Sequence, residues 1–577
     1  MRRLLAALAA GVLLAGCGLP LEDGVQAPGD VRAEQLDRQG IDILPPGPQP
    51  GAAPESVVQG FLNAQISASD QHGIARSFLA PEARASWDDA AAVRVYAPGS
   101  RRESPEEDGD EATVRVSYSA VGQVGADGAA RVQSPEAVTD TYRLRRDAAG
   151  SWQLVEVPAG LTLSTDDRDR AFTPFGVHFL APLPPPGEDR HLVVDRRLLP
   201  TGSGPAELVG AVLAGPGSGL GDSALTAVPA GTALASPVAV DASGAEVTVD
   251  LTGQVLALPD ASRRALAAQL VWTLRQLPDL VRLRLLAEGE PFSVGGSGDA
   301  LRLDAFEDYD PQGLDGDDDR TGLAVLAGRV RALGDGRSVP VALQQLTTVR
   351  DVAVDVRSGD VAALTGVEGG LLSLVVGPAG GPLTTAGQAG GLRSPTWGNG
   401  AYGPWLVRTG SDPALLVVRG GALQQVPVAD LPALGDEPVL RLSRDGARLA
   451  LVGAGGALWV GRVRPATPDG TPSVADLRRL RTSGTLDVGF VDDTELAVLV
   501  DDERAPLVRL SVDGASQVGT GLLVAAVEPR TVAALGDAPV LVGTTAGGGG
   551  QPTTYSGQLG GAFTSALDGG ERPRYPD

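Results

Sequence analysis

The region from 52 to 165 begins with apolar residues at helical spacing and continues with strand-like alternation. Apolar residues recur three or four positions apart over 57–66, which predicts a helix. A second, shorter helix is predicted to end at Pro81. Alternation of apolar and polar residues then predicts three strands, over 113–118, 138–145 and 152–157. This region is therefore predicted to be a mixed α+β domain, with Trp87 and Trp152 in its core.

The region from 191 to 305 alternates strands with helices. The predicted strands lie at 192–195, 247–251 and 281–285. The first predicted helix has Pro205 in its first turn and is ended by Gly215 and Pro216. A longer helix carries leucines on one face, is expected to be capped by Asp260 or Ser262, and is ended by Pro278. This pattern predicts a second α+β domain. Segments rich in proline or in acidic residues flank it, and we interpret them as linkers over 166–190 and 306–320.

From 321 to 577 the pattern changes to short strands of Val, Leu and Ala joined by tight polar turns. One hairpin turns at Ser443–Gly446, and similar hairpins recur at 354–364 and 488–498. The copies lie roughly 40 to 50 residues apart, which is the period of propeller blades. Because one blade cannot bury both faces alone, the blades must close into a ring, with room for about six. An array of β-sandwiches is the alternative, and 572–577 is expected to be a frayed end.

The N-terminal residues have the pattern of an export signal. Two arginines precede an apolar run that is too short to span a bilayer, which needs ~20 residues. The run ends in the motif Leu14, Ala15, Gly16 and Cys17. This motif resembles the lipobox of bacterial lipoproteins, which implies cleavage before Cys17 and its modification by diacylglyceryl and N-acyl chains such as palmitate. A plain secretory signal with an incidental cysteine is the alternative.

These features predict how the N-terminal part of the chain is used. We expect a signal peptide over 1–16 and a flexible tether, rich in proline and glycine, over 17–51. The lipid on Cys17 is then expected to hold the protein at the extracytoplasmic face of the cell membrane.

Composition limits the possible partners. The formal net charge is −24, and the sequence contains no lysine. A chain of this charge is repelled by nucleic acid and by anionic membrane surfaces. We therefore expect no nucleic-acid partner, and membrane attachment through lipid alone. Aromatic residues make up only 4% of the chain, so the cores are predicted to consist of Ala, Val and Leu.

Candidate catalytic and metal-binding groups are sparse. Without lysine, neither a Gly-Lys phosphate loop nor a Ser-Lys mechanism is available. His178 and His191 flank a Pro-rich segment and are expected to be exposed, and His72 has no obvious acidic partner. A calcium loop is suggested by the spacing of Asp308, Asp310, Gly313, Asp315 and Asp317. The glutamate that an EF-hand requires is missing, so a solvated linker is the favoured interpretation. We expect no cofactor, no bound metal, no catalytic residues and no enzymatic activity.

Two of the predicted domains resemble known families. The helices and hairpins of 52–165, ending in Gly-x-Trp-x-Leu at 150–154, are similar to the nuclear-transport-factor-like (NTF2-like) fold. Four ordered motifs in 191–305 resemble the GerMN domain, and they are Leu213–Pro216, Gly231–Thr232, Val249–Leu251 and Leu270–Leu274. The second resemblance implies a binding or scaffolding module rather than an enzyme.

The complete order of signal, tether, two α+β domains and propeller resembles the LpqB family of actinobacterial lipoproteins. The motifs that carry this resemblance are Cys17, Leu213–Pro216, Val271–Leu274 and Ser443–Gly446. It implies association with the extracellular part of the MtrB sensor kinase, and thereby a role in the MtrA/MtrB two-component system and cell-envelope homeostasis. A non-enzymatic accessory protein is therefore the expected function. A lipoprotein that binds cell-wall glycan or peptide is the alternative, and a hydrolase with a propeller active site is the third reading.

Overall fold

The structure is a computed structural model that describes residues 45–182, 191–295, 300–312, 320–334, 338–398, 402–465, 471–482, 484–502, 506–520, 528–545 and 551–577. Cys17, the predicted signal peptide and most of the predicted tether lie outside these ranges. Within the ranges, every helix is too short or too polar to cross a membrane.

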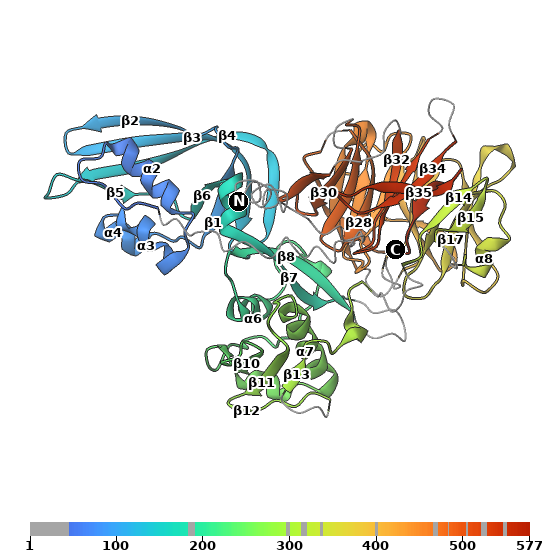
Figure 1. Ribbon diagram of the computed structural model, residues 1–577, viewed down its shortest axis with the longest axis horizontal. Coiled ribbons are helices and arrows are strands. Elements are labelled where there is room, and N and C mark those ends of the chain that lie inside the picture. Colours follow the sequence, from blue (N-terminus) through green and yellow to red (C-terminus); the bar gives the residue numbers. More distant parts are fainter. Residues whose placement is uncertain are drawn as a thin grey trace, which may run out of the picture. The chain divides into compact units, whose positions relative to one another are not determined.

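Three short helices and a six-stranded sheet form the N-terminal domain (Figure 1). The helices are α2 (Pro54–Ala64), α3 (Ser69–Ser77) and α4 (Pro81–Ser86). The strands are β1 (Ala92–Tyr96), β2 (Arg102–Asp108), β3 (Glu111–Gly125), β4 (Ala130–Arg146), β5 (Trp152–Glu156) and β6 (Leu161–Ser164). The order across the sheet is β5-β4-β3-β1-β6, with β2 paired to β3. This arrangement confirms the predicted α+β class.

The core of this domain contains the aromatic residues that the sequence pattern placed there. Trp87 and Trp152 are both 5% exposed, and the ring of Trp87 lies 5.2 Å from that of Phe61 in an edge-on contact. One detail of the prediction is wrong. Pro81 does not end the second helix but begins α4, because proline fits the first helical turn, where its missing N–H is not needed.

The segment assigned to a linker over 166–190 is instead partly ordered structure. It contains most of α5 (Thr165–Ala171) and all of β7 (Phe172–Leu180), which pairs antiparallel with β8 (Leu192–Pro200) along its whole length. We call β7 and β8 together the ribbon. Val177 and Phe179 alternate with more polar neighbours and are fully buried. The proline-rich residues that follow masked this alternation in the sequence.

The second α+β domain is built around a parallel strand pair joined by a helix. Its helices are α6 (Pro205–Leu213), η1 (Gly221–Ser223), η2 (Gly253–Ala257), α7 (Asp260–Leu274) and η3 (Glu307–Tyr309). Its strands are β9 (Ala239–Val240), β10 (Glu246–Leu251), β11 (Arg282–Ala287), β12 (Glu290–Pro291) and β13 (Ala300–Arg302). Helix α7 connects β10 to β11, which pair in parallel as such a crossover allows.

Two expectations for this domain need correction. The N-cap of α7 is Pro259, rather than Asp260 or Ser262, and no side chain caps the helix. The start of the predicted acidic linker 306–320 also belongs to the core. Phe306 and Tyr309 are buried, and the Trp272 indole N–H donates to the Phe306 carbonyl at 2.9 Å. Residues 313–319 lie outside the described residues.

The remaining strands form six antiparallel sheets (Figure 1). The first sheet contains β14 (Leu323–Leu326), β15 (Arg329–Ala332) and β36 (Glu571–Arg574). The second and third contain β16 (Val349–Val354), β17 (Val361–Gly366), β18 (Leu372–Gly377), β19 (Thr384–Ala389), β20 (Leu392–Thr396), β21 (Trp405–Arg408), β22 (Ala414–Arg419) and β23 (Ala422–Gln425). Short helices at α8 (Val341–Gln344), η5 (Glu368–Gly370) and η6 (Ala454–Gly456) lie between strands.

The other three sheets repeat the same four-stranded plan. They contain β24 (Val439–Leu442), β25 (Arg448–Val452), β26 (Leu458–Arg464), β27 (Ser473–Arg479), β28 (Thr485–Asp492), β29 (Glu495–Val500), β30 (Leu507–Ser511), β31 (Gln517–Thr520), β32 (Pro529–Ala533), β33 (Val540–Thr544), β34 (Thr553–Gly557) and β35 (Phe563–Asp568). Apolar side chains from neighbouring sheets pack against each other, so each interface between sheets forms a small core of its own.

The sheets close into a ring. Strand β16 contacts β20, and the contacts continue through β24, β28, β32 and β36 back to β16. These six strands therefore surround the centre of the ring. The closing strand β36 pairs with β14, from the other end of the region. The expectation that 572–577 is a frayed end is wrong, because pairing with β14 orders the segment and Tyr575 is buried against Ala533 and Leu535.

Candidate functional site

The predicted lipidation motif cannot be placed in the structure. Leu14, Ala15, Gly16 and Cys17 lie outside the described residues. The modification of Cys17 therefore stays a prediction from the sequence. Two other places in the described chain bring together buried polar groups and charges, and they are the ribbon with its neighbours and a cavity near the centre of the ring.

The ribbon has two free edges, and each is covered by a different element. On the β7 edge, the Thr273 hydroxyl accepts from the His178 backbone N–H at 3.0 Å. The Gln269 amide donates to the His178 carbonyl at 3.1 Å. The Gln276 amide likewise bonds both the N–H and the carbonyl of Gly176. Three polar residues at helical spacing on and just after α7 thus satisfy backbone groups that burial would otherwise leave unpaired.

On the β8 edge, the propeller supplies the partners. The Val194 N–H donates to Asp445 Oδ2 at 3.2 Å, and the Arg448 guanidinium donates to the Val194 carbonyl at 2.8 Å. The ring of His191 bonds the Asp445 carbonyl at 3.2 Å. Because the free backbone groups of one β8 residue meet a carboxylate and a guanidinium, the propeller completes the edge of the ribbon.

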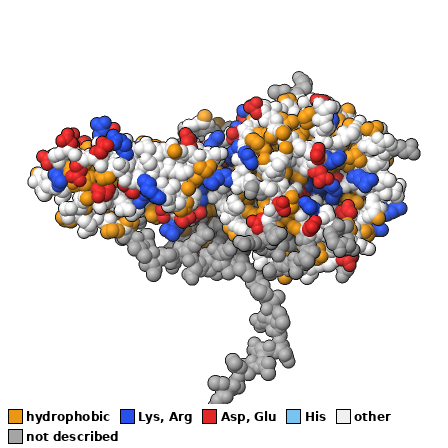
Figure 2. All heavy atoms as spheres, turned by 90° about the horizontal axis from the view of Figure 1, so that it is seen from above, with side chains coloured by type: hydrophobic (Ala, Val, Ile, Leu, Met, Phe, Trp, Pro, Cys, Tyr) orange, Lys and Arg blue, Asp and Glu red, His pale blue; other side chains and the backbone are white. Residues whose placement is uncertain are grey.

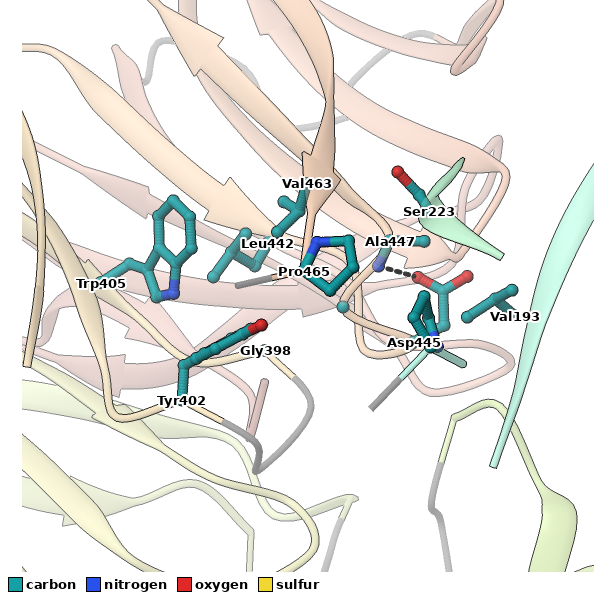
Figure 3. A pocket seen from close by; sticks show the side chains of 12 residues that line it. Val193, Ser223, Gly398, Tyr402, Trp405, Leu442, Asp445, Ala447, Val463 and Pro465 are labelled. Atoms are coloured by element: carbon teal, nitrogen blue, oxygen red, sulfur yellow. Dashed lines mark hydrogen bonds between the residues drawn. The ribbon is translucent and has the colours of Figure 1, made fainter. Parts of the chain in front are cut away.

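Asp445 belongs to a turn whose sequence was singled out above, Ser443–Gly446. Its other carboxylate oxygen closes the turn, accepting from the Ser443 hydroxyl and from the Ala447 N–H at 2.9 Å (Figure 3). Gly446 has a φ of 70°, which a residue without a Cβ adopts at little cost. One oxygen of Asp445 therefore shapes the turn, and the other holds β8.

The turn at Ser511–Gly514 has the same arrangement, in which one carboxylate oxygen closes the turn and the other contacts β8. Asp513 Oδ1 accepts from the Ser511 hydroxyl and the Ala515 N–H, and Oδ2 pairs with the Arg196 guanidinium of β8. Both charged side chains are buried. Burial alone would raise the pKa of Asp513, but Arg196 and the hydrogen bonds to Ser511 and Ala515 lower it overall.

The ribbon also contacts the N-terminal domain. The Leu198 N–H donates to the Gly128 carbonyl at 2.8 Å, and the Ser218 N–H donates to Asp127 Oδ2 at 2.7 Å. Gly128 has a φ of 78°, and a Cβ there would lie 3.0 Å from the Leu198 carbonyl oxygen. The turn that contains Gly128 therefore has no room for a side chain. All three domains meet at β8.

A small cavity of about 30 Å³ lies beside this junction (Figure 3). Val193 and Ser223 line it from the second domain, and Tyr402, Trp405 and Asp445 line it from the propeller. This volume holds one or two waters. The cavity is therefore a feature of the junction rather than a ligand site.

A much larger cavity, of about 630 Å³, lies where strands at the ring centre begin, and we call it the funnel cavity. The β14–β15 turn and the first residues of β16, β20 and β36 line it. Its charged residues are Arg350, Asp351, Arg393, Glu437, Glu571 and Arg572. Volumes of roughly 300–1,000 Å³ are typical of small-molecule sites. Over the face drawn in Figure 2, arginine and acidic side chains are interspersed rather than separated into patches of one sign.

Buried ion pairs lie beneath the funnel cavity. Arg574 donates to Asp351 Oδ2 at 2.9 Å, and Arg441 lies 3.3 Å from Asp487 Oδ1. Arg441 also donates to the hydroxyl of Ser394, at 2.5 Å. Burial by itself lowers the pKa of Arg574, but the Asp351 carboxylate raises it overall. These pairs cross between neighbouring strands at the ring centre and fix the base of the cavity.

The histidines lie in places that the sequence did not indicate. His178 and His191 are buried rather than exposed, because the ribbon replaces the predicted linker. Burial lowers the pKa of each to about 3. His72 stacks edge-on against Trp87, and burial lowers its pKa although Asp89 acts in the opposite direction.

The suggested calcium loop is not assembled by the residues that can be seen. Asp308 pairs with the Arg264 guanidinium at 2.9 Å, and Asp310 accepts from the Gln312 N–H. Gly313, Asp315 and Asp317 lie outside the described residues. In the described part of the chain, no three His, Cys, Asp or Glu side chains are grouped so as to hold a metal ion.

The sequence analysis did not predict the ribbon contacts or the funnel cavity. The ribbon contacts could have been suspected from the polar residues at 269, 273 and 276, which follow one face of an otherwise apolar helix. The funnel cavity has no local sequence signal, because its residues come from separate sheets that only ring closure brings together.

Comparison with known proteins finds a family match for each of the three domains. Residues 47–169 match the family described as "Lipoprotein LpqB, N-terminal domain", and 328–570 match "Lipoprotein LpqB beta-propeller domain". Residues 179–293 match the Germane family, described as "Sporulation and spore germination". The tandem GerMN domains of the sporulation protein GerM from Bacillus subtilis are a structural neighbour, with 17% identity, a TM-score of 0.19, and coverage of 26% of this chain and 56% of that one.

Curated relatives match over nearly the complete chain. The Cutibacterium acnes "Lipoprotein LpqB" is 26% identical over 90% of this chain and 90% of its own length. The protein of the same name from Thermobifida fusca is 27% identical over 92% of this chain and 93% of its own. The matched domains define a multidomain protein with an LpqB-type N-terminal domain, a GerMN-like domain and a β-propeller. The chain belongs to the LpqB lipoprotein family.

Proposed function

We propose that this chain is a lipid-anchored, extracytoplasmic accessory protein that regulates a two-component sensor kinase of the MtrA/MtrB type in cell-envelope homeostasis. In this proposal the protein has no enzymatic activity, and its surfaces act by binding the extracellular part of the kinase. The observation that carries the proposal is the junction at β8, where buried contacts join all three domains. Membership of the LpqB family supports the same role.

The physical basis is confinement. Two or more acyl chains hold a protein stably on a membrane, since each buried methylene contributes ~0.8 kcal/mol. A lipid on Cys17 would therefore keep the domains near a membrane-embedded partner and raise their effective concentration without adding any contact. Domains joined through buried ion pairs and backbone hydrogen bonds present a defined surface to that partner.

Co-purification from native membranes tests the proposal. The unmodified chain and Gly18→Ala, a control that keeps the lipidation motif, should remain in the membrane fraction and recover the sensor kinase. Cys17→Ser should be released and recover far less kinase. Equal regulation of the kinase by the released Cys17→Ser variant, at matched cellular level, would contradict the role of the anchor. Absence of the kinase from all three samples would contradict the partner.

A second candidate function is binding of cell-wall glycan or peptide, and the funnel cavity favours it. Its volume and its polar lining suit a hydrophilic ligand. Saturable binding of the purified chain to peptidoglycan, with no kinase recovered from membranes, would support this function over the first.

A further inference from the structure

The funnel cavity carries charges of both signs that are not paired with each other. Arg350 and Arg393 lie on one part of its lining, at the starts of β16 and β20. Glu571, at the start of β36, and Glu437, before β24, flank these arginines on opposite sides in the ring order β36-β16-β20-β24. None of these four side chains forms an ion pair within the described ranges, although the two signs share one cavity of about 630 Å³.

At the base of the cavity, by contrast, opposite charges are paired. There, Arg574 and Asp351 pair at 2.9 Å, and Arg441 pairs with Asp487. Opposite charges in a partly enclosed space attract each other unless the backbone holds them apart. Among the lining residues themselves, Arg572 approaches Asp351 to 4.0 Å, whereas Arg350, Arg393, Glu437 and Glu571 are left available to a ligand.

The backbone around the cavity is also unusual. Ala327, Ser394 and Arg572 all line it, and their φ values are 50°, 53° and 50°. Residues with a Cβ rarely adopt this left-handed conformation, and such positions cluster at ligand clamps. At Ser394, hydrogen bonds from Arg441 and from the Leu440 N–H to the hydroxyl hold the conformation in place.

We infer that the funnel cavity binds a small zwitterionic ligand of the amino-acid or short-peptide class. Arg350 and Arg393 receive its carboxylate, because a guanidinium forms paired, charge-assisted hydrogen bonds with a planar carboxylate. Glu437, which precedes β24, the neighbour of the Arg393 strand β20, receives its ammonium group. In a chain of net charge −24, a purely anionic ligand is repelled by the overall field, whereas a zwitterion is not. This inference gives the second candidate function a ligand class and is independent of the kinase partner.

The probe for this inference is the dipeptide alanyl-alanine, titrated calorimetrically into the detergent-solubilised full chain. We expect saturable binding. N-acetyl-alanyl-alanine lacks the ammonium, alanyl-alanine amide lacks the carboxylate, and each should bind at least about tenfold more weakly, the effect of losing a charged hydrogen bond. Glucuronic acid, a sugar acid without an ammonium group, should also bind weakly.

Two substitutions in the cavity lining and two control substitutions test which ligand group each charge binds. Arg393→Gln should weaken the dipeptide about tenfold but leave the weak binding of the amide unchanged. Glu437→Gln should weaken the dipeptide but leave the N-acetyl form unchanged. Arg331→Gln and Asp436→Asn change exposed residues outside the cavity and should have no effect.

Three results would overturn the inference. These are the absence of saturable dipeptide binding, tighter binding of glucuronic acid than of the dipeptide, and equal losses in the control variants. None of them bears on recovery of the sensor kinase, so failure here and failure of the accessory role are distinguishable. An unchanged thermal midpoint in each variant shows that a loss of binding comes from the cavity and not from unfolding.

Discussion

The buried pair between Arg196 and Asp513 allows the strongest test of how the domains are joined. Asp513→Asn keeps an amide oxygen in the position of Oδ1, so the Ser511 and Ala515 hydrogen bonds that close the turn are retained. The substitution replaces the charged oxygen that faces Arg196 with an uncharged NH2 group, which cannot accept from the guanidinium. It therefore separates the docking role of Asp513 from its role in the turn.

The magnitude follows from burial. The Arg196 and Asp513 side chains are 6% and 7% exposed, so Arg196 would be left as an uncompensated buried charge. Breaking such a pair by removing one partner costs about 3–5 kcal/mol. The exposed pair between Glu495 and Arg509, in the same sheet as Asp513, is the control. Glu495→Gln should cost about 0–1 kcal/mol, because solvent screens the pair.

Hydrogen exchange at β8 amides measures this difference directly. Asp513→Asn should lower the free energy of local opening by about 3 kcal/mol, which is roughly a hundredfold faster exchange. Glu495→Gln should leave exchange at β8 unchanged. If both variants exchange alike, or if β8 exchange is unaffected in Asp513→Asn, the ion pair does not hold the domains together.

The pH dependence gives an independent check on the same pair. The folded-state pKa of Asp513 is lowered below its ordinary value of about 3.9. Its contribution to stability is therefore complete above that value and is lost as the pH falls through the folded-state pKa. Acid should loosen β8 in the unmodified chain, and Asp513→Asn should lack this part of the acid response.

Three further predictions concern other parts of the fold. Deletion of 571–577 removes β36, the strand that closes the ring. Calorimetry should then show that the propeller no longer unfolds in one cooperative transition. A retained transition would contradict closure by β36. Burial lowers the pKa of His178 to about 3, whereas its unfolded value is about 6.5. The free energy of unfolding should therefore fall as the pH drops from 6.5 towards 3. Urea titrations of His178→Phe should show a smaller dependence on pH. Gln269→Leu leaves the Ala227 N–H and the His178 carbonyl without their partner. Urea denaturation should show that the free energy of unfolding falls by about 2–4 kcal/mol. An unchanged free energy would mean that these groups find other partners.

Much of the domain organisation was predictable because it rests on local patterns. Alternation over 113–118 and 138–145 reflects strands with one buried face, and these positions fall inside β3 and β4. The turn at 443–446 was recognisable because serine, aspartate and glycine have specific roles in tight turns. Patterns of this kind depend on neighbours a few residues apart, which a single sequence displays.

The features that escaped prediction depend on distant partners. Residues 571–574 contain a proline and three charged residues and look like a tail, and only β14 gives them a strand to pair with. Strand β7 was missed because the proline-rich residues that follow it favoured a linker, and the α7 side chains that complete its edge lie nearly a hundred residues later in the chain. Residues of three different sheets line the funnel cavity, so it forms only when those sheets pack together. In each case the contact that decides the structure joins residues far apart in the sequence.

The alternation of β8 explains how one strand can serve three domains. Val194 and Arg196 are two residues apart, and they meet Asp445 and Asp513 of the propeller. Asp195 and Arg197, which lie between and beside them, pair with each other and bond the segment after α6 through Gly217 and Gly215. Val194 meets the propeller through its backbone groups at the strand edge, and the Arg196 side chain points to the opposite side from those of Asp195 and Arg197, so the two sets of contacts do not compete.

The same strand ends at the N-terminal domain, where Leu198 bonds Gly128. A perturbation at any one of these contacts therefore changes a strand that the other domains share. A partner that binds the propeller can in this way alter the position of the N-terminal domain, which is the domain nearest in sequence to the predicted lipid anchor. This connection is the physical basis on which the proposed accessory role would operate without any chemical step.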